Sequence, residues 1–121
     1  MLSAQGYWSA FAGKWDVGFA TQGHIPHGRG YNSSLGYFFQ INDYWTQGMV
    51  GSEGSGCAAA KVDLWMDEQP ASDLNGTAYE EVLFEKHLHD AIATFAAGPM
   101  KDGRNYTRNP SIACCAICIP K

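Results

Sequence analysis

Residues 77–97 carry the longest helical pattern in the chain, and this segment limits the possible fold more than any other feature. Thr77 is predicted to cap the helix, Glu80 to complete a capping box, and Gly98-Pro99 to end it. A helix with one apolar stripe must bury that stripe against another layer. The stripe recurs at intervals of three and four residues, at Tyr79, Val82, Leu83, Leu88, Ala91, Ile92 and Phe95.

The partner layer is predicted to be a sheet built from the apolar runs at 8–15 and 112–119 and from a short strand at 62–65. Residues 8–15 are apolar on both faces, as buried strands of parallel sheets are. Residues 18–61 are instead rich in Gly, Ser, Asn and aromatic residues without a sustained period. We expect a long irregular excursion there, with a short helical turn near Ser34–Phe39.

The predicted fold class is therefore α/β: a fragment of a mostly parallel sheet, or βαβ-like unit, with a long glycine- and aromatic-rich irregular insertion. We expect residues 1–97 to form the main domain and 98–121 to be a divergent tail that adds one further strand. Both edges of such a unit would be open. Self-association through exposed strands is expected.

Composition excludes several classes of partner. A chain of 121 residues is one domain by length, and its net charge of −4 gives no reason to expect nucleic acid or a membrane surface. No apolar run approaches the length that spans a bilayer. Any binding of an anion must therefore be local.

One local arrangement suits a tetrahedral anion. The stretch Gly13-Lys14-Trp15-Asp16-Val17-Gly18 places a lysine at the end of the first predicted strand, between glycines. A second glycine-rich turn, Pro26-His27-Gly28-Arg29-Gly30-Tyr31-Asn32, carries an arginine. Glycine lets the backbone approach a ligand closely, and both cations are suited to oxyanions. His24 and His27 are candidates to face the same cleft.

These segments also resemble a known family. Leu2–Gly18, LSAQGYWSAFAGKWDVG, resembles the type I sulfatase segment that reads L-x-x-A-G-Y-x-T-x-x-x-G-K-W-H-x-G. The resemblance continues through HIPHGRGYNSSLGYFFQINDYWTQ and VDLWMDEQPASDLNGTAYEEVLFEKHLHDAI, so that it covers roughly residues 2–92, and it is strongest to the arylsulfatase branch. It implies that residues 1–97 are part of an alkaline-phosphatase-like catalytic domain that hydrolyses sulfate monoesters of small molecules or carbohydrates.

The resemblance also implies roles for individual residues. Lys14 matches the active-site lysine of G-K-W-H, which contacts the sulfate oxygens. Asp16 stands where the family has histidine, which removes a hydrogen-bond donor and places a carboxylate near an anionic substrate. Arg29 lies in the family's R-G-[FY]-D stretch, where an arginine is expected to clamp the loop. We interpret His24, His27 and Arg29 as candidate substrate-binding residues.

Other parts of the family's machinery do not match. The formylglycine precursor, a cysteine in C-x-[PA]-[SA]-R, is absent: Cys118-Ile119-Pro120-Lys121 lacks the Ser/Ala-Arg pair. Calcium is expected for the complete family enzyme, but its ligands are not recognisable. We interpret Asp63 and Asp67 as loop and capping carboxylates, and no metal ligand is assigned.

Three functions remain open. The first is a fragment of a sulfuric ester hydrolase that is active only when other segments complete it. The second is a truncated, non-catalytic module that binds anions or sugars. The third is a small metal-binding or interaction domain, in which His87 and His89 would meet Cys115 and Cys118; the spacing of the two histidines places them on different helical faces.

The compartment is not fixed by the sequence. Sulfatases of this type are commonly secreted or lysosomal, and three acceptor sequons begin at Asn32, Asn75 and Asn105. The chain has no secretory signal after Met1. That points to a missing N-terminal portion at least as readily as to a cytosolic protein. Cys57 and the three tail cysteines define no disulfide framework.

Overall fold

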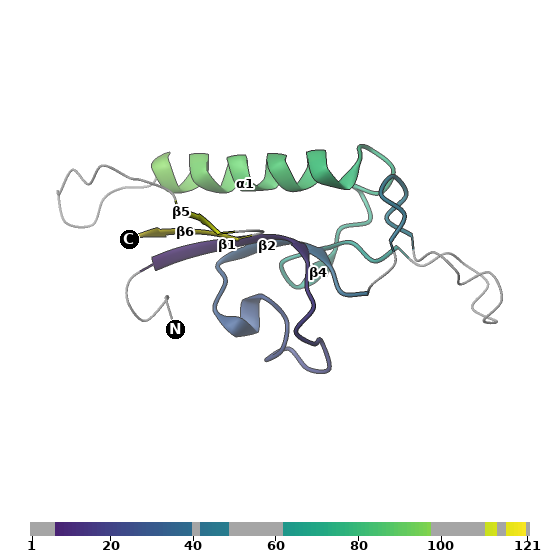
Figure 1. The fold of residues 1–121 in the computed structure, drawn as a ribbon, viewed down its shortest axis with the longest axis horizontal. Helices are drawn as coiled ribbons and strands as arrows, with labels where there is room; N and C mark the ends of the chain where they lie inside the picture. The colour runs from purple at the N-terminus through teal and green to yellow at the C-terminus, as the bar shows by residue number, and fades with distance from the viewer. Residues whose placement is uncertain (1–6, 40–41, 49–61, 98–110, 114–115, 121) are drawn as a thin grey trace.

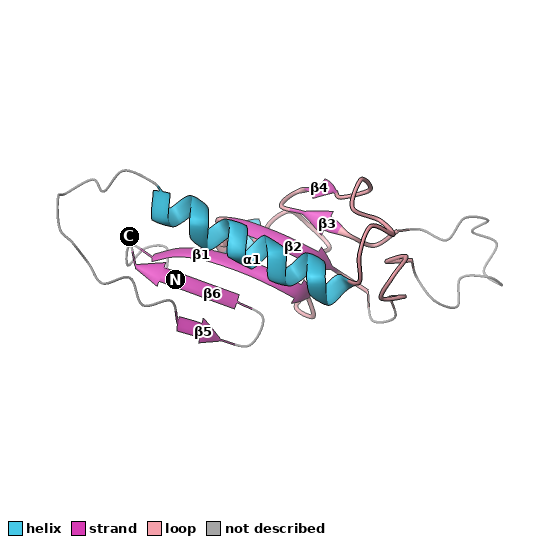
Figure 2. Ribbon diagram, turned by 90° about the horizontal axis from the view of Figure 1, so that it is seen from above, coloured by secondary structure: helices cyan, strands magenta, loops and turns pink. Residues whose placement is uncertain are grey.

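The computed structural model describes residues 7–39, 42–48, 62–97, 111–113 and 116–120. One helix lies along one face of a sheet, as Figure 1 shows from the side and Figure 2 from above. The elements in chain order are β1 (Tyr7–Lys14), the 3-10 helix η2 (His27–Arg29), β2 (Ser33–Tyr37), β3 (Trp65–Met66), β4 (Gln69–Pro70), α1 (Glu80–Ala97), β5 (Ser111–Ala113) and β6 (Ala116–Pro120).

The sheet has the strand order β4-β3-β2-β1-β6-β5. The α/β fold class is confirmed, but the expectation of a mostly parallel sheet is wrong. Only β1 and β2 pair in parallel among these strands, and the other neighbours pair antiparallel. The tail forms two strands rather than one, and β6 runs antiparallel to β1. A βαβ-like connection through the helix would make the tail strand parallel to β1. An apolar run indicates that a segment is buried but not in which direction its strand runs, so the sequence could not show that β6 is antiparallel.

The segment Ser33–Tyr37 is a strand between β1 and β3, not the helical turn that we predicted near Ser34–Phe39. Leu35 at its centre is only 1% exposed and belongs to the main core. The pairing with β1 aligns Gly36 with Gly13. This crowded position favours glycine, a residue that also makes a short strand look like a loop in sequence.

The two faces of the sheet are covered differently. On one face, α1 packs on β1 and β2: the Trp8 and Phe95 rings lie 6.1 Å apart, and Tyr37 stacks on Phe84 at 6.2 Å. On the other face, the Phe11 ring contacts Trp15 of the following segment at 5.2 Å. Figure 1 shows the segment between β1 and β2 running below the sheet, opposite α1. Main-core residues gather where α1 meets β2 and the loops beyond it, and comprise Leu35, Leu64, Ala71 and Leu83.

The predicted helix is confirmed, but its start is not at Thr77. The Thr77 hydroxyl donates to the Leu74 carbonyl at 2.7 Å, so it is used inside the preceding turn. Helical hydrogen bonding begins at the Tyr79 carbonyl, and Glu80 is the first helical residue. Tyr79 and Val82, which we placed in the apolar stripe, are exposed. No helix in the described part of the chain is long and apolar enough to cross a membrane.

Glu80 is a buried carboxylic acid at the start of α1. Its backbone N–H donates to the Tyr44 carbonyl at 2.9 Å, and the residue is 6% exposed. Among the described residues its Oε2 atom has no hydrogen-bond partner. Burial raises the pKa of Glu80 above its ordinary value of 4.5, the charge of Glu81 raises it further, and a hydrogen bond with the Tyr37 side chain opposes the shift. The folded protein therefore holds this proton more tightly than the unfolded chain does.

This shift predicts a pH-dependent effect of Glu80→Gln. The stability that the raised pKa contributes is present below pH 4.5 and is lost as the pH rises through the raised value. Because glutamine stays neutral, the variant should gain stability relative to the wild type as the pH rises above 4.5. Urea unfolding of both proteins at pH values below and above 4.5 measures the change. The exposed Glu85→Gln variant is the control, and a difference that is constant with pH would contradict the prediction.

Candidate functional site

Lys14 ends β1 and lies beside Tyr37 in the parallel register. Residues aligned in this way point to the same face of a sheet. Because Tyr37 stacks on Phe84 of α1, Lys14 belongs to the helix face, at the carboxyl end of the parallel pair. Its side chain is one-third exposed, and its Nζ atom lies 3.2 Å from Oδ1 of Asp16. The structure thus brings together the two residues that we placed in the catalytic part of the site.

Trp15 fixes the turn that holds Asp16 next to Lys14. Its backbone N–H donates to the Tyr37 carbonyl at 2.8 Å, which extends the pairing of β1 and β2 by one bond. Its indole N–H donates to the carbonyls of Gly18 at 2.8 Å and His24 at 2.9 Å. Trp15 is buried, whereas Asp16 is exposed. The Asp16 carboxylate is therefore presented from an anchored turn.

The other candidate residues lie in the segment that covers the opposite face of the sheet. His24, His27 and Arg29 are all exposed. Nδ1 of His24 lies 2.8 Å from the Thr21 hydroxyl oxygen. In the described part of the chain, no hydrogen bond or ion pair joins any of these three side chains to Lys14. The geometry does not assemble the predicted residues into one cluster.

Asn32 makes the connection that we assigned to Arg29. The Asn32 Oδ1 atom accepts a hydrogen bond from the Ser9 N–H at 2.9 Å, and its own N–H donates to the Ser9 carbonyl at 2.8 Å. The Arg29 N–H donates to the carbonyls of Ile25 and Pro26, but its guanidinium binds none of the described residues. The sequence analysis gave the clamping role to Arg29 and none to Asn32, although asparagine in a turn often bonds to backbone groups.

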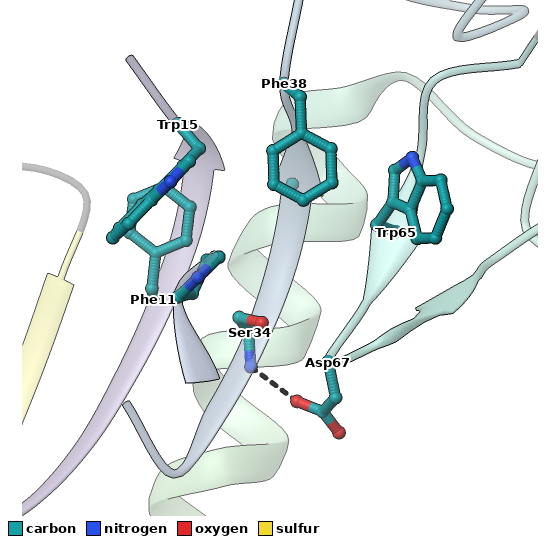
Figure 3. Close-up of a pocket in the computed structure, with 8 residues that line it drawn as sticks. Phe11, Trp15, Ser34, Phe38, Trp65 and Asp67 are labelled. Carbon is teal, nitrogen blue, oxygen red and sulfur yellow. Dashed lines mark hydrogen bonds between the residues drawn. The ribbon is translucent and has the colours of Figure 1, made fainter. Parts of the chain in front are cut away.

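A small hollow lies on the face of the sheet opposite α1, between aromatic rings (Figure 3). Phe11 and Trp15 form one side, and Phe38 and Trp65, with ring centroids 5.6 Å apart, form the other. The space between the rings is about 10 Å³, which is room for one water molecule. The rings contact each other in pairs, so the hollow is a small gap in the side-chain packing of this face.

The Asp63 and Asp67 carboxylates hold the backbone. Oδ2 of Asp63 accepts hydrogen bonds from the N–H groups of Phe38 at 3.0 Å and Phe39 at 2.7 Å. Oδ1 of Asp67 accepts from the Ser34 N–H at 2.7 Å, the bond drawn in Figure 3. These bonds agree with the interpretation of both as loop carboxylates, but neither residue lies at the end of a helix.

The described residues do not fit a metal site. They contain no group of three or more His, Cys, Asp or Glu side chains that could hold an ion. The calcium expected from the family resemblance is therefore assigned to no residue of the described ranges.

The zinc hypothesis gains no support from the two helical histidines. Nε2 of His87 lies 3.3 Å from the Ser33 hydroxyl oxygen, in the interface between α1 and β2. Burial lowers the pKa of His87, Lys86 lowers it further, and Asp67 and Asp90 oppose the shift. His89 is exposed beside Glu85. Cys57, Cys114 and Cys115 lie outside the described residues, and only the backbone of Cys118 is placed, within β6.

The three sequons have different surroundings. Asn32 is exposed, with its Oδ1 atom bonded to Ser9. The Asn75 amide nitrogen donates to the Thr46 carbonyl, so a glycan there would have to replace this bond. Asn105 lies outside the described residues. Glycosylation stays a prediction.

Comparison with known proteins supports a distant sulfatase-like relationship. No family model matches the chain, and no solved structure matches it significantly. The chain is 26% identical over 93 residues to arylsulfatase J of Mus musculus. That match covers 77% of this chain but only 15% of the length of the relative. The chain therefore spans only a small part of the length of this relative.

Proposed function

We propose that this chain is part of a sulfuric ester hydrolase of the arylsulfatase kind, in which Lys14 contacts the sulfate group. The observation that carries the proposal is the position of Lys14, one-third exposed at the carboxyl end of the parallel β1–β2 pair. Functional groups collect at this end of parallel strands. The distant similarity to arylsulfatase J supports the sulfatase-like part of the proposal.

The contribution of this chain to the reaction would be electrostatic. A sulfate monoester carries its negative charge on the sulfate oxygens, and a fixed ammonium group stabilises that charge. The sequence contains no formylglycine precursor motif. Hydrolysis of a small-molecule or carbohydrate sulfate ester would thus require a nucleophile from another segment. The proposal also includes secretion or a lysosomal location.

Sulfate binding by Lys14→Ala tests this proposal. Because a hydrogen bond to a charged group is lost, we expect the affinity for sulfate to fall about tenfold. The measurement is a titration with sodium sulfate at constant ionic strength, followed by amide chemical shifts. Lys86→Ala is the matched control, since Lys86 is an exposed lysine that also pairs with an aspartate. Equal losses in the two variants would show non-specific screening and would contradict a role for Lys14.

A non-catalytic module that binds anions or sugars is the second candidate. Asp16 favours a non-catalytic role, because its exposed carboxylate pairs with Lys14 and removes the hydrogen-bond donor that the resembled motif has at this position. The longest natural form of the protein, incubated with an aryl sulfate and a carbohydrate sulfate, distinguishes the two. Release of inorganic sulfate supports the hydrolase. Sulfate binding that depends on Lys14 without any release supports the binding module.

A further inference from the structure

We infer that Asp16 is an internal anion that occupies Lys14 and thereby sets which external anions this site accepts. The inference rests on the proposed function, because it concerns the same lysine. It adds a specificity-determining residue: an external oxyanion must displace the Asp16 carboxylate before Lys14 Nζ can bind it.

The first support is distance. Oδ1 of Asp16 lies 3.2 Å from Lys14 Nζ, within the range of a charge-assisted hydrogen bond. A carboxylate oxygen in this place presents the same type of acceptor as an oxygen of sulfate. The two ligands would therefore compete for the same ammonium protons.

The second support is the anchoring of the turn. Three hydrogen bonds from Trp15, one from its backbone to Tyr37 and two from its indole to Gly18 and His24, restrain the residues on both sides of Asp16. An anchored carboxylate loses less conformational freedom when it pairs than a free one does. Formation of the Lys14–Asp16 contact should therefore cost less conformational entropy than formation of an ordinary exposed ion pair.

The third support is local charge. Lys14 and Asp16 carry opposite charges, so the pair is close to neutral. The acid Glu80, which hydrogen-bonds to the Tyr37 side chain beside Lys14, adds no positive charge, and Arg29 lies in the segment on the opposite face of the sheet. A monoanion such as chloride is attracted only weakly to a nearly neutral pair, whereas a doubly charged sulfate is attracted more strongly to Lys14.

Asp16→Asn tests the inference through sulfate affinity. We expect sulfate to bind about fivefold more tightly than to the wild type, which is the upper range for release of an exposed ion pair. Chloride competition should also become stronger. Asp90→Asn is the matched control, because it frees Lys86 from a comparable exposed pair in α1 and should leave sulfate affinity unchanged. Asp16 is exposed, and the amide spectrum of the variant checks that the fold is retained.

The outcomes separate this inference from the proposed function. If Lys14→Ala weakens sulfate binding while Asp16→Asn leaves the affinity unchanged, the inference is wrong and the proposed function stands. If the Asp16→Asn and Lys14→Ala double variant keeps the gain, the gain does not come from Lys14 and the inference is also wrong. If neither the wild type nor Asp16→Asn binds sulfate, Lys14 is no sulfate site and both fall.

Discussion

Gly36→Ala is expected to lower the free energy of unfolding by about 3 kcal/mol, the upper end of the usual cost of overpacking. A Cβ atom at Gly36 would lie 2.0 Å from the carbonyl oxygen of Gly13 and 3.1 Å from a ring carbon of Phe11. Because the first of these is backbone of the neighbouring strand, the two strands must separate to relieve the clash. Separation would break the parallel pairing that places Lys14 next to Tyr37.

Gly23→Ala is the control for this prediction. A Cβ atom at Gly23 would meet the Thr21 hydroxyl oxygen at 3.6 Å, an ordinary contact. Urea unfolding followed by tryptophan fluorescence compares the two variants with the wild type. We expect Gly23→Ala to unfold at nearly the wild-type midpoint. A similar midpoint for Gly36→Ala would mean that β1 and β2 are not packed in the described register.

Asp63→Ala is expected to cost about 3 kcal/mol of stability, because two hydrogen bonds to a buried carboxylate are lost. Asp63 is 3% exposed, and its Oδ2 atom holds the consecutive N–H groups of Phe38 and Phe39. These amides follow the end of β2. Their release should loosen the chain immediately after Tyr37, which amide exchange at Phe38 and Phe39 would detect.

Asp43→Ala provides the comparison for Asp63→Ala. Its Oδ1 atom also accepts from two consecutive backbone N–H groups, those of Trp45 and Thr46, but the residue is exposed. The Thr46 N–H and hydroxyl, together with the Trp45 N–H, hold the pKa of Asp43 below its ordinary value. Since water can replace its hydrogen bonds, we expect a much smaller loss of stability. Equal losses in both variants would show that burial is not the reason for the effect at Asp63.

The helix was predictable because its evidence is local. Side chains at three- and four-residue spacing lie on one face of any helix, whatever surrounds it. Its first turn was not predictable, because a threonine hydroxyl can either cap a helix or bond within the preceding turn. Here the Thr77 hydroxyl donates to the Leu74 carbonyl in the preceding turn. The buried face of α1 also differs from the predicted apolar stripe: His87 contacts β2, whereas Tyr79 and Val82 are exposed to solvent.

The strands illustrate the opposite case. The segment Ser33–Tyr37 has no strong strand pattern of its own, and it is extended because β1 and β3 pair with it on either side. Strand direction in the tail likewise depends on pairing, which the sequence of one segment does not encode.

The candidate site was predicted only in part. The glycine-flanked motif placed Lys14 at a strand end, as the structure has it. The ion pair with Asp16 depends on the Trp15 hydrogen bonds, and the role of Asn32 depends on Ser9, far away in the chain. Contacts between turns of this kind cannot be deduced from composition or spacing.

Pro70 has a consequence for assembly. It lies in β4, the two-residue strand at one edge of the described sheet, and a proline has no N–H with which to pair a further strand. The other edge is β5. Two copies of the chain that join through strands would therefore meet edge to edge at β5, and each would turn its proline-bearing edge outward. A further copy would find no N–H at Pro70 with which to extend the sheet at that edge.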